Sequence, residues 1–283
     1  MTPIVLVTDQ IRGIYADDLE LHSAFAARGV EATFVPWDAP VDWARFKAAV
    51  IRTPWDYHER FAEFSAWLDR LDAAGVPLWN PSSLIRWNAR KTYLLELASE
   101  GFPVIPTAQV SDDGLARHVE RWREIVVKPE VGGGGAWTFR ANEGSFRAVE
   151  AELAQAGDRK FLVQPFDPAV TRGEWSLVYF DGVFSHAVFK VARSGEFRIH
   201  EEHGGRILPA EADAGLRSVA DRFATARGIL PYARVDLLGE GASARLVELE
   251  LIEPELFFRF SAGAPTRYAD ALVARLDMGT RTP

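Results

Sequence analysis

Residues Ile125–Ala136 read Ile-Val-Val-Lys-Pro-Glu-Val-Gly-Gly-Gly-Gly-Ala. They predict a short β-branched strand that delivers Lys128 into a loop of four consecutive glycines. Backbone N–H groups can crowd around a polyphosphate in such a loop because no Cβ stands in their way, and the lysine adds a point charge. No Gly-Lys-Ser/Thr follows, so this is not a Walker A loop. Since a glycine run alone is more often a hairpin tip, the rest of the chain has to supply the other parts of a phosphate site.

The composition excludes several classes of protein. With 283 residues, 48% hydrophobic and 25% charged, the chain is long enough for two or three packed units of a globular protein. A formal net charge of −8 argues against a nucleic-acid partner, which would need a basic face. No window approaches eighteen consecutive apolar residues, so no membrane partner is expected. The absence of cysteine excludes disulfides and thiolate sites, and a cytoplasmic location is expected.

The first eighty residues predict a parallel α/β layer, because strands and helices alternate along them. The strands are expected at 4–7, 31–37, 48–52 and 76–79, and the helices at 17–28 and 61–75. Ligands of parallel sheets bind at the carboxyl ends of the strands. Two polar stretches lie at such ends, Thr8-Asp9-Gln10 and Arg52-Thr-Pro-Trp-Asp-Tyr57. The sequence therefore places a ligand at this edge of the layer.

The remaining residues predict a mixture of helices and antiparallel strands. Helices are expected at 88–99, after a cap at Ser111, and at 146–153, 209–227 and 265–276. An extended segment at 103–107 and a strand at 161–166 complete the middle of the chain. Asp181-Gly182 is the strongest turn signal, and it predicts a hairpin over 174–190. A second hairpin is expected from 233–238 and 245–251.

The second hairpin carries a pattern of charged residues. Arg234 and Asp236 alternate on one strand, and Glu248 and Glu250 alternate on the other, so each pair lies on one face of its strand. If the strands pair, three carboxylates and an arginine converge. Such oxygen donors suit a hard cation such as Mg2+ shared with phosphate oxygens. A solvated antiparallel face is an equal alternative for this hairpin taken alone.

The ordered set of these features resembles the ATP-grasp ligases, and the resemblance covers nearly the whole chain. The residues that carry it are Lys91, Lys128-Pro129, Gly132 to Gly135, Gln164-Pro165-Phe166, Glu174, Lys190, Arg234-x-Asp236 and Glu248-x-Glu250. The resemblance implies an ATP-grasp fold, α/β in its Rossmann-like N-terminal layer and α+β in the two subdomains that clasp ATP. The expected domains are 1–80, a central subdomain with the glycine-rich flap at 81–167, and a C-terminal subdomain with the metal site at 168–283.

The resemblance also implies roles for individual residues. The nucleotide would be held by Lys91, Lys128, the flap Gly132, Gly133, Gly134 and Gly135, the adenine hinge Gln164, Pro165 and Phe166, the ribose-binding Glu174, and Lys190. The expected catalytic residues are Arg234, Lys190 and Arg198. The expected metal ligands are Asp236, Glu248 and Glu250, although many family members have Asn at the third position. The cofactors would be ATP and two Mg2+ ions, with Mn2+ as an alternative metal.

Three further stretches resemble the subgroup containing the cycloserine-biosynthesis cyclo-ligase, which closes the ring of O-ureido-serine at the expense of ATP. They are 52–57, His203-Gly-Gly205 and Glu248-Leu-Glu-Leu-Ile-Glu-Pro254. The resemblance implies an ADP-forming ligase that activates a small-molecule carboxylate as an acyl phosphate and couples it to a nitrogen nucleophile. The expected substrate residues are Arg52, Trp55, Asp56, Tyr57, His203 and Gly204.

Alternatives stay open at this point. Arg52 either binds a substrate carboxylate or pairs with Asp56 or Asp9 to brace its loop. Two other functions also remain open for the whole protein. One is an ATP-grasp kinase without an amine acceptor, and the other is a nucleotide-binding regulatory module without turnover. A homodimer is compatible with the sequence.

Overall fold

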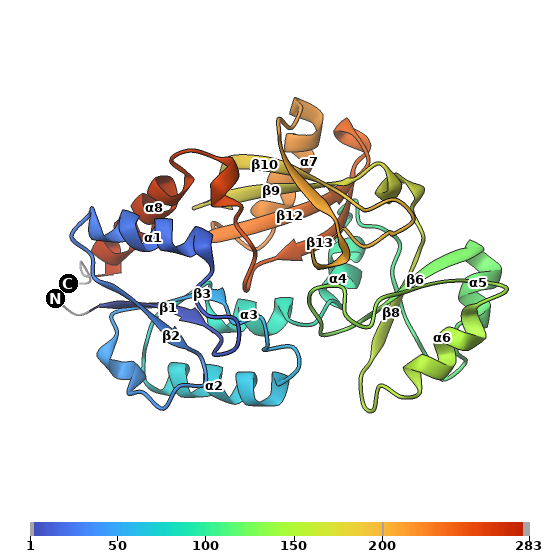
Figure 1. The fold of residues 1–283 in the computed structure, drawn as a ribbon, viewed down its shortest axis with the longest axis horizontal. Coiled ribbons are helices and arrows are strands. Elements are labelled where there is room, and N and C mark those ends of the chain that lie inside the picture. The colour runs from blue at the N-terminus through green and yellow to red at the C-terminus, as the bar shows by residue number, and fades with distance from the viewer. Residues whose placement is uncertain (1–2, 200, 280–283) are drawn as a thin grey trace.

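The computed structural model describes residues 3–199 and 201–279, which fold around three β-sheets (Figure 1). The N-terminal sheet is parallel, with the order β2-β1-β3-β4. Its strands are β1 Ile4–Thr8, β2 Ala32–Pro36, β3 Ala49–Thr53 and β4 Leu78–Trp79. Helices α1 Ala16–Ala26 and α2 Phe61–Ala73 accompany it. β1 is apolar at successive positions because both of its faces are covered: Ile4 and Leu6 join the core that includes α1, and Val5 and Val7 join the core that includes α2.

The second sheet is antiparallel, with the order β5-β8-β6-β7. Its strands are β5 Ala108–Gln109, β6 Glu124–Pro129, β7 Phe139–Asn142 and β8 Phe161–Pro165. Helices α5 Ala116–Trp122 and α6 Phe146–Leu153 form a separate small core with it. The glycine loop connects β6 to β7 at this sheet, which forms the right-hand end of the molecule in Figure 1.

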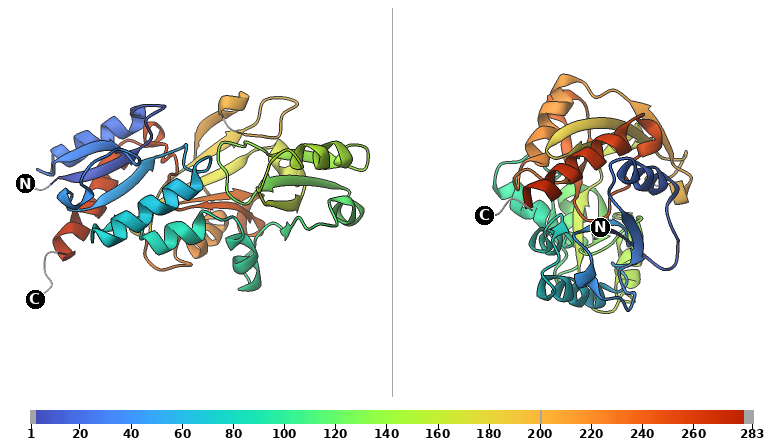
Figure 2. Two further views of the ribbon diagram at one scale, coloured as in Figure 1. Left: turned by 90° about the horizontal axis from the view of Figure 1, so that it is seen from below. Right: turned by 90° about the vertical axis from the view of Figure 1, so that its left-hand side faces the viewer.

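The third sheet is antiparallel, with the order β11-β10-β9-β12-β13. Its strands are β9 Glu174–Phe180, β10 Val183–Val191, β11 Arg206–Ala210, β12 Tyr232–Leu238 and β13 Arg245–Glu250. Helices α4 Tyr93–Ser99 and α7 Ala214–Ala224 share a core with one of its faces. Helix α8 Ala264–Gly279 packs against the other face and against α1, which joins this sheet to the N-terminal layer (Figures 1 and 2).

The connections hold helix α3 Ser82–Asn88 and several short 3-10 helices. The latter are Trp43–Arg45, Pro168–Thr171, Glu201–His203, Gly241–Ser243 and Phe258–Phe260. Within the described residues, no helix combines the length and apolar character needed to cross a bilayer. Each sheet lies within one of the three segments expected as domains, although α4 packs on the third sheet rather than the second. The domain boundaries themselves stay a prediction.

Both predicted hairpins are confirmed. At the tip of the first, Asp181 and Gly182 have φ values of 51° and 74°, the left-handed conformation that a two-residue turn of this kind requires. The second hairpin pairs β12 with β13 as expected. The glycine-rich stretch also follows a strand, β6, as its sequence predicts.

Three helix predictions were wrong in their boundaries. The helix expected at 88–99 begins at Tyr93, because α3 ends at Asn88 and a turn follows it. Ser111 caps no helix; its carbonyl accepts from Gly114 N–H in a turn, and α5 starts later. The first residues of the helix expected at 209–227 pair with β10 as strand β11 instead. The true start of α7 is marked by Asp213, whose side chain accepts from Leu216 N–H.

Candidate active site

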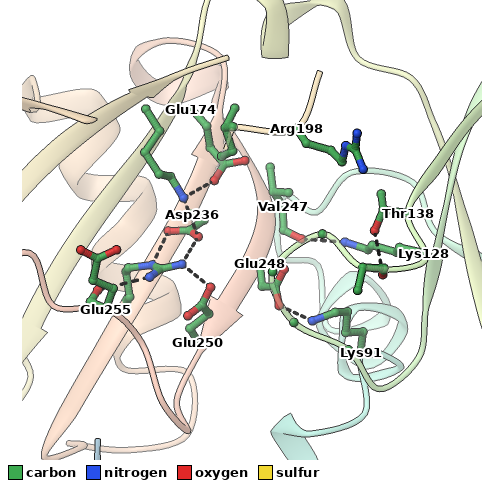
Figure 3. Close-up of a pocket in the computed structure, with 18 of the residues that line it drawn as sticks. Lys91, Lys128, Thr138, Glu174, Arg198, Asp236, Val247, Glu248, Glu250 and Glu255 are labelled. Atoms are coloured by element: carbon green, nitrogen blue, oxygen red, sulfur yellow. Dashed lines mark hydrogen bonds and ion pairs between the residues drawn. The ribbon is translucent and has the colours of Figure 1, made fainter. Parts of the chain in front are cut away.

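A cavity of about 540 Å³ lies where the three sheets meet. Its walls come from the loops after β1 and β3, the glycine loop, the end of β8, and the facing strands β12 and β13. In Figure 3, the carboxylates of the third sheet face the lysines Lys91 and Lys128 across this space. The two polar strand ends expected at the edge of the N-terminal layer therefore both lead to the cavity.

The hairpin of β12 and β13 brings the expected charges together. Arg234 lies opposite Glu250, and Asp236 lies opposite Glu248. Asp236 accepts from Ser176 Oγ at 2.6 Å and pairs with Arg234 at 2.9 Å and Lys190 at 3.1 Å. Burial would raise the pKa of Asp236, but Arg234 and Lys190 outweigh that effect and hold it below its usual value. The convergence predicted from period-two spacing is confirmed, and the hairpin is no solvated face.

The same wall carries more carboxylates than its cations neutralise. Burial raises the pKa of Glu250 to about 8, with the negative charges of Asp236 and Glu248 adding to the shift. Burial likewise raises the pKa of Glu253 to about 7. A bound divalent cation would relieve this excess of negative charge, and carboxylate oxygens are the donors that hard cations prefer. The residues therefore fit a magnesium-type ion.

The carboxylates are nevertheless not arranged around one point. Among the described residues, no group of three or more His, Asp or Glu side chains is assembled as a metal site. Glu248 forms an ion pair with Lys91, and Glu250 forms one with Arg234. Metal binding at this hairpin would require these ion pairs to rearrange, and the assignment of individual ligands stays a prediction.

Lys128 is a buried cation without a carboxylate partner among the residues that the structure describes. Its Nζ donates to the carbonyl of Val247 at 3.3 Å, and the described residues provide no ion pair for it. Burial lowers the pKa of Lys128 to about 8. A buried ammonium group held only by a carbonyl is suited to a phosphate, which would supply the missing negative charge.

The glycine loop has little room for side chains, and two of its residues have left-handed backbone conformations. A Cβ on Gly132 would lie 2.4 Å from Pro129 Cγ, and one on Gly133 would lie 3.0 Å from His58 Cδ2. Gly134 and Gly135 have φ values of 59° and 70°, which side chains rarely adopt. The loop can therefore present backbone N–H groups closely to a ligand, which supports its expected role as a phosphate flap.

The hinge residues Gln164, Pro165 and Phe166 also line the cavity. Gln164 Nε2 donates to Thr107 Oγ1 at 2.9 Å, which holds its amide in place. The guanidinium of Arg140 stacks on the Phe166 ring, with Cζ 3.7 Å from the ring centre. An aromatic face held in this way suits the base of a nucleotide.

The remaining predicted ATP and catalytic residues also face the cavity, but each has an ionic partner there. Lys190 pairs with Glu174 at 2.6 Å. Arg198 pairs with Glu196 at 2.7 Å. Their roles toward ATP stay predictions, because both ion pairs would compete with a phosphate or a ribose.

The predicted substrate residues divide into two groups. Trp55, Tyr57 and His203 line the cavity. Trp55 Nε1 donates to the carbonyl of Glu253 at 3.2 Å, and His203 Nε2 lies 3.3 Å from the carbonyl of Gly134 in the glycine loop.

Arg52 does not enter the cavity, which corrects its expected role toward substrate. Its side chain is only 1% exposed, and its Nε donates to Asp18 at 3.0 Å. The bracing alternative describes its position, but the partner is Asp18 of α1 rather than Asp56 or Asp9. The Pro54 turn moves the chain toward the cavity only after Arg52, whose side chain points between the sheet and α1.

Neither Asp56 nor Gly204 lines the cavity, so their expected roles toward substrate stay predictions without support from this geometry. Asp56 is buried and accepts from Trp37 Nε1 at 2.7 Å, so it stabilises the loop internally. Gly204 has a φ of 81°, and its N–H donates to Glu201 O at 2.8 Å, which makes it a turn residue.

Among the cavity residues that the sequence did not single out are Arg12, Tyr15, His58 and Glu255. Arg12 lies just beyond the polar end of β1, His58 directly follows Tyr57, and Glu255 directly follows Pro254, so continuing each polar stretch would have found them. Tyr15 lacks such a signal, because an isolated aromatic side chain is usually part of a core.

The second and third sheets enclose the cavity between a glycine loop and a carboxylate-bearing hairpin, which is the arrangement of ATP-grasp enzymes. Comparison with known proteins agrees. Residues 4–80 match the family model "D-cycloserine synthetase DcsG, N-terminal domain". Residues 96–254 match "Prokaryotic glutathione synthetase, ATP-grasp domain".

Individual relatives cover most of the chain. The cycloserine biosynthesis protein DcsG of Streptomyces lavendulae is 36% identical over 296 residues, which is 96% of this chain and 98% of that protein. The crystal structure of D-cycloserine synthetase DcsG superimposes with a TM-score of 0.86 at 33% identity, covering 96% of this chain and 99% of the other. A D-alanine–D-alanine ligase from Bacillus anthracis shares the fold, with a TM-score of 0.70 at 14% identity and coverage of 99% and 98%.

The chain belongs to the ATP-grasp ligase family. It is an ATP-dependent, ADP-forming carboxylate–amine ligase that uses a divalent metal, and its fold and reaction class match those expected from the sequence.

Proposed function

We propose that the ligase activates the carboxylate of a small amino-acid derivative as an acyl phosphate and closes a ring by attack of a nitrogen in the same molecule. O-ureido-serine, whose cyclisation gives cycloserine, is the first substrate to test. The main observation behind this proposal is that two elements face one cavity. They are Lys128, which has no carboxylate partner among the described residues, and the hairpin of β12 and β13, which bears Arg234. The likeness to DcsG over 96% of the chain supports this choice of substrate.

In this proposal, residues of the second and third sheets bind the nucleotide between them. Lys91, Lys128 and the N–H groups of the glycine loop hold the phosphates, while the hinge at 164–166 receives adenine. Glu174 would bind the ribose, and Lys190 would approach the γ-phosphate. These groups mainly position ATP and neutralise its phosphate oxygens, which is most of what phosphoryl transfer requires from a protein.

Asp236, Glu248 and Glu250 would hold the metal, as two Mg2+ ions, with Mn2+ as a substitute. When bound, the metal neutralises charge on the phosphate oxygens. Glu250 in place of the Asn common in the family adds a charge to the ligand set and is expected to tighten binding.

The reaction then has two steps. A carboxylate oxygen of the substrate attacks the γ-phosphorus, and ADP leaves. The substrate nitrogen next attacks the acyl carbon, and inorganic phosphate leaves. Arg234 is suited to stabilise the tetrahedral oxyanion of the second step, and Arg198 the transferred phosphoryl group. A closed glycine loop would exclude water that would otherwise hydrolyse the acyl phosphate.

The test is ADP release screened over O-ureido-serine, amino acids and dipeptides, with analysis of each product by mass spectrometry. Ligation predicts equal amounts of ADP, inorganic phosphate and a condensed or cyclised product. A phosphorylated product that persists without a nitrogen nucleophile would instead identify a kinase. No ADP release with any carboxylate would favour the regulatory-module alternative.

Other expectations belong to the same proposal. The acidic net charge of −8 supports the absence of a nucleic-acid partner. We also propose a cytoplasmic protein without a membrane partner, in which a homodimer is the oligomer to look for by light scattering.

A further inference from the structure

We propose that Arg12 binds the substrate carboxylate and holds it for attack on ATP, the role that the sequence had suggested for Arg52. This inference rests on the proposed ligase function. It identifies the anchor of that substrate at the loop after β1, which lines the cavity.

Arg12 is held at the cavity by the loop that follows β1. Asp9, at the end of this strand, is buried and accepts from the backbone N–H groups of Ile11 at 2.9 Å and Arg12 at 2.7 Å. The Asp9 N–H donates to Thr53 O at 3.1 Å, which ties the loop to the end of β3. The guanidinium of Arg12 lies 3.3 Å from Asp9 through Nη1. Asp9 therefore fixes both the backbone and the side chain of Arg12.

The guanidinium keeps most of its hydrogen-bonding capacity. Asp9 is its single partner among the described residues, and the side chain remains 49% exposed within the cavity wall. An arginine has five N–H donors in a planar fork that matches a carboxylate. A substrate carboxylate can therefore bind without breaking the contact between Arg12 and Asp9.

The other cations of the cavity are less suited to this task. Lys91, Lys190 and Arg234 are buried, and each forms an ion pair with a glutamate. Arg198 already uses its guanidinium fork on both carboxylate oxygens of Glu196, through Nε at 3.2 Å and Nη2 at 2.7 Å. Lys128 lies on β6 beside the glycine loop, where the phosphates are expected.

Arg12 instead shares its wall with Tyr15, Trp55 and Glu253, on the side of the N-terminal layer. Because the same cavity also carries several carboxylates, an anionic substrate requires a positive charge that is still able to bind it, and Arg12 provides one. Arg12 also lies close enough to His58 for its charge, with that of Lys91, to add to the burial that lowers the pKa of His58, and the His58 ring lies beside Gly133. A carboxylate on Arg12 would therefore share the cavity with the glycine loop that is expected to cover the phosphates.

The kinetic test compares Arg12→Ala, Arg12→Lys and the wild type in the ADP-release assay with O-ureido-serine. Arg12→Ala should raise KM for the carboxylate roughly ten- to a hundred-fold, the loss expected for charge-assisted hydrogen bonds. KM for ATP and the melting temperature should stay within error, and Arg12→Lys should recover part of the loss because it restores the charge without the fork. The matched control is Arg45→Ala, because Arg45 is an exposed arginine in the connection between β2 and β3 of the same sheet. This variant should leave both KM values and the melting temperature unchanged.

A second readout does not depend on turnover. Phenylglyoxal should modify Arg12 in the free protein, as measured by peptide mass spectrometry, and O-ureido-serine should protect it while a non-hydrolysable ATP analogue should not. An unchanged carboxylate KM in Arg12→Ala, or protection by the ATP analogue alone, would overturn the assignment while leaving the ligase function intact. If the wild type releases no ADP with any carboxylate in the screen, the proposed function fails and the assignment of Arg12 fails with it.

Discussion

Arg52 provides a sharp test of how the N-terminal layer is joined to the rest of the molecule. Its guanidinium donates to Asp18 of α1 at 3.0 Å and to the carbonyl of Pro254 at 3.4 Å, and it lies 5.9 Å from the Phe258 ring centre. These partners come from the N-terminal layer and from the segment that follows β13. Removing the arginine would leave Asp18 buried and uncompensated.

The perturbation is Arg52→Met, which keeps much of the side-chain volume but removes the charge. Breaking one side of a buried ion pair costs about 3–5 kcal/mol of unfolding free energy. For a chain of this length, each kcal/mol lowers the melting temperature by roughly 2–4 °C, so a decrease on the order of 10 °C is expected. Adding Asp18→Asn removes the stranded charge, and the double variant should lose less stability than the sum of the single variants.

The assay is thermal and urea unfolding followed by circular dichroism, combined with KM for each substrate at a temperature where all variants are folded. Arg45→Ala serves as the control because it is exposed. The reasoning would be refuted by an Arg52→Met variant with wild-type stability and a raised KM for the carboxylate alone, since that result places the guanidinium at the substrate.

Other predictions concern the nucleotide, the metal and the pH dependence of stability. Lys128→Ala should lower the affinity for a non-hydrolysable ATP analogue about ten- to a hundred-fold in calorimetric titration. Lys160→Ala, which changes an exposed lysine, should leave this affinity unchanged. Equal affinities of Lys128→Ala and the wild type would show that Lys128 does not bind phosphate. Glu248→Gln should lower activity and raise the Mg2+ concentration needed for half-maximal rate, with Glu240→Gln as an exposed control, and an unchanged Mg2+ requirement would contradict the metal assignment. Burial lowers the pKa of His186 from 6.5 to about 4, so this side chain binds a proton more tightly in the unfolded chain than in the folded protein. The free energy of unfolding should therefore decrease by up to about 3 kcal/mol as the pH falls from about 6.5 through 4. Urea unfolding of His186→Gln over this pH range should show a shallower loss than the wild type, and parallel curves would assign the acid sensitivity to other groups.

Local patterns in the sequence were sufficient for much of the fold. The alternation of strands and helices in the first eighty residues indicated the parallel layer, and Asp181-Gly182 located the hairpin of β9 and β10. The period-two spacing of Arg234 and Asp236 placed the charges on one face, where cross-strand pairing brings in Glu248 and Glu250. These features depend on neighbours in sequence or on one hairpin, which is why a single sequence reveals them.

Features that depend on tertiary contacts were missed or misassigned. Strand β11 resembled the beginning of a helix, and only its pairing with β10 reveals a strand. Arg52 had plausible partners close in sequence, but α1 places Asp18 nearer to it than those partners. Arg12 carried no motif, because its suitability for a carboxylate depends on the cavity into which the β1 loop turns.

Transfer of oxygen-18 from the substrate to phosphate tests the central claim, activation of the carboxylate as an acyl phosphate. The wild-type protein would be incubated with ATP, Mg2+ and O-ureido-serine labelled with oxygen-18 in both carboxylate oxygens. Attack of the carboxylate on the γ-phosphorus transfers one of its oxygens to phosphate when the nitrogen displaces it. Mass spectrometry should therefore find a single oxygen-18 in the inorganic phosphate released with each product molecule. Product formation with unlabelled phosphate would contradict the account, because the carboxylate would then never have been phosphorylated.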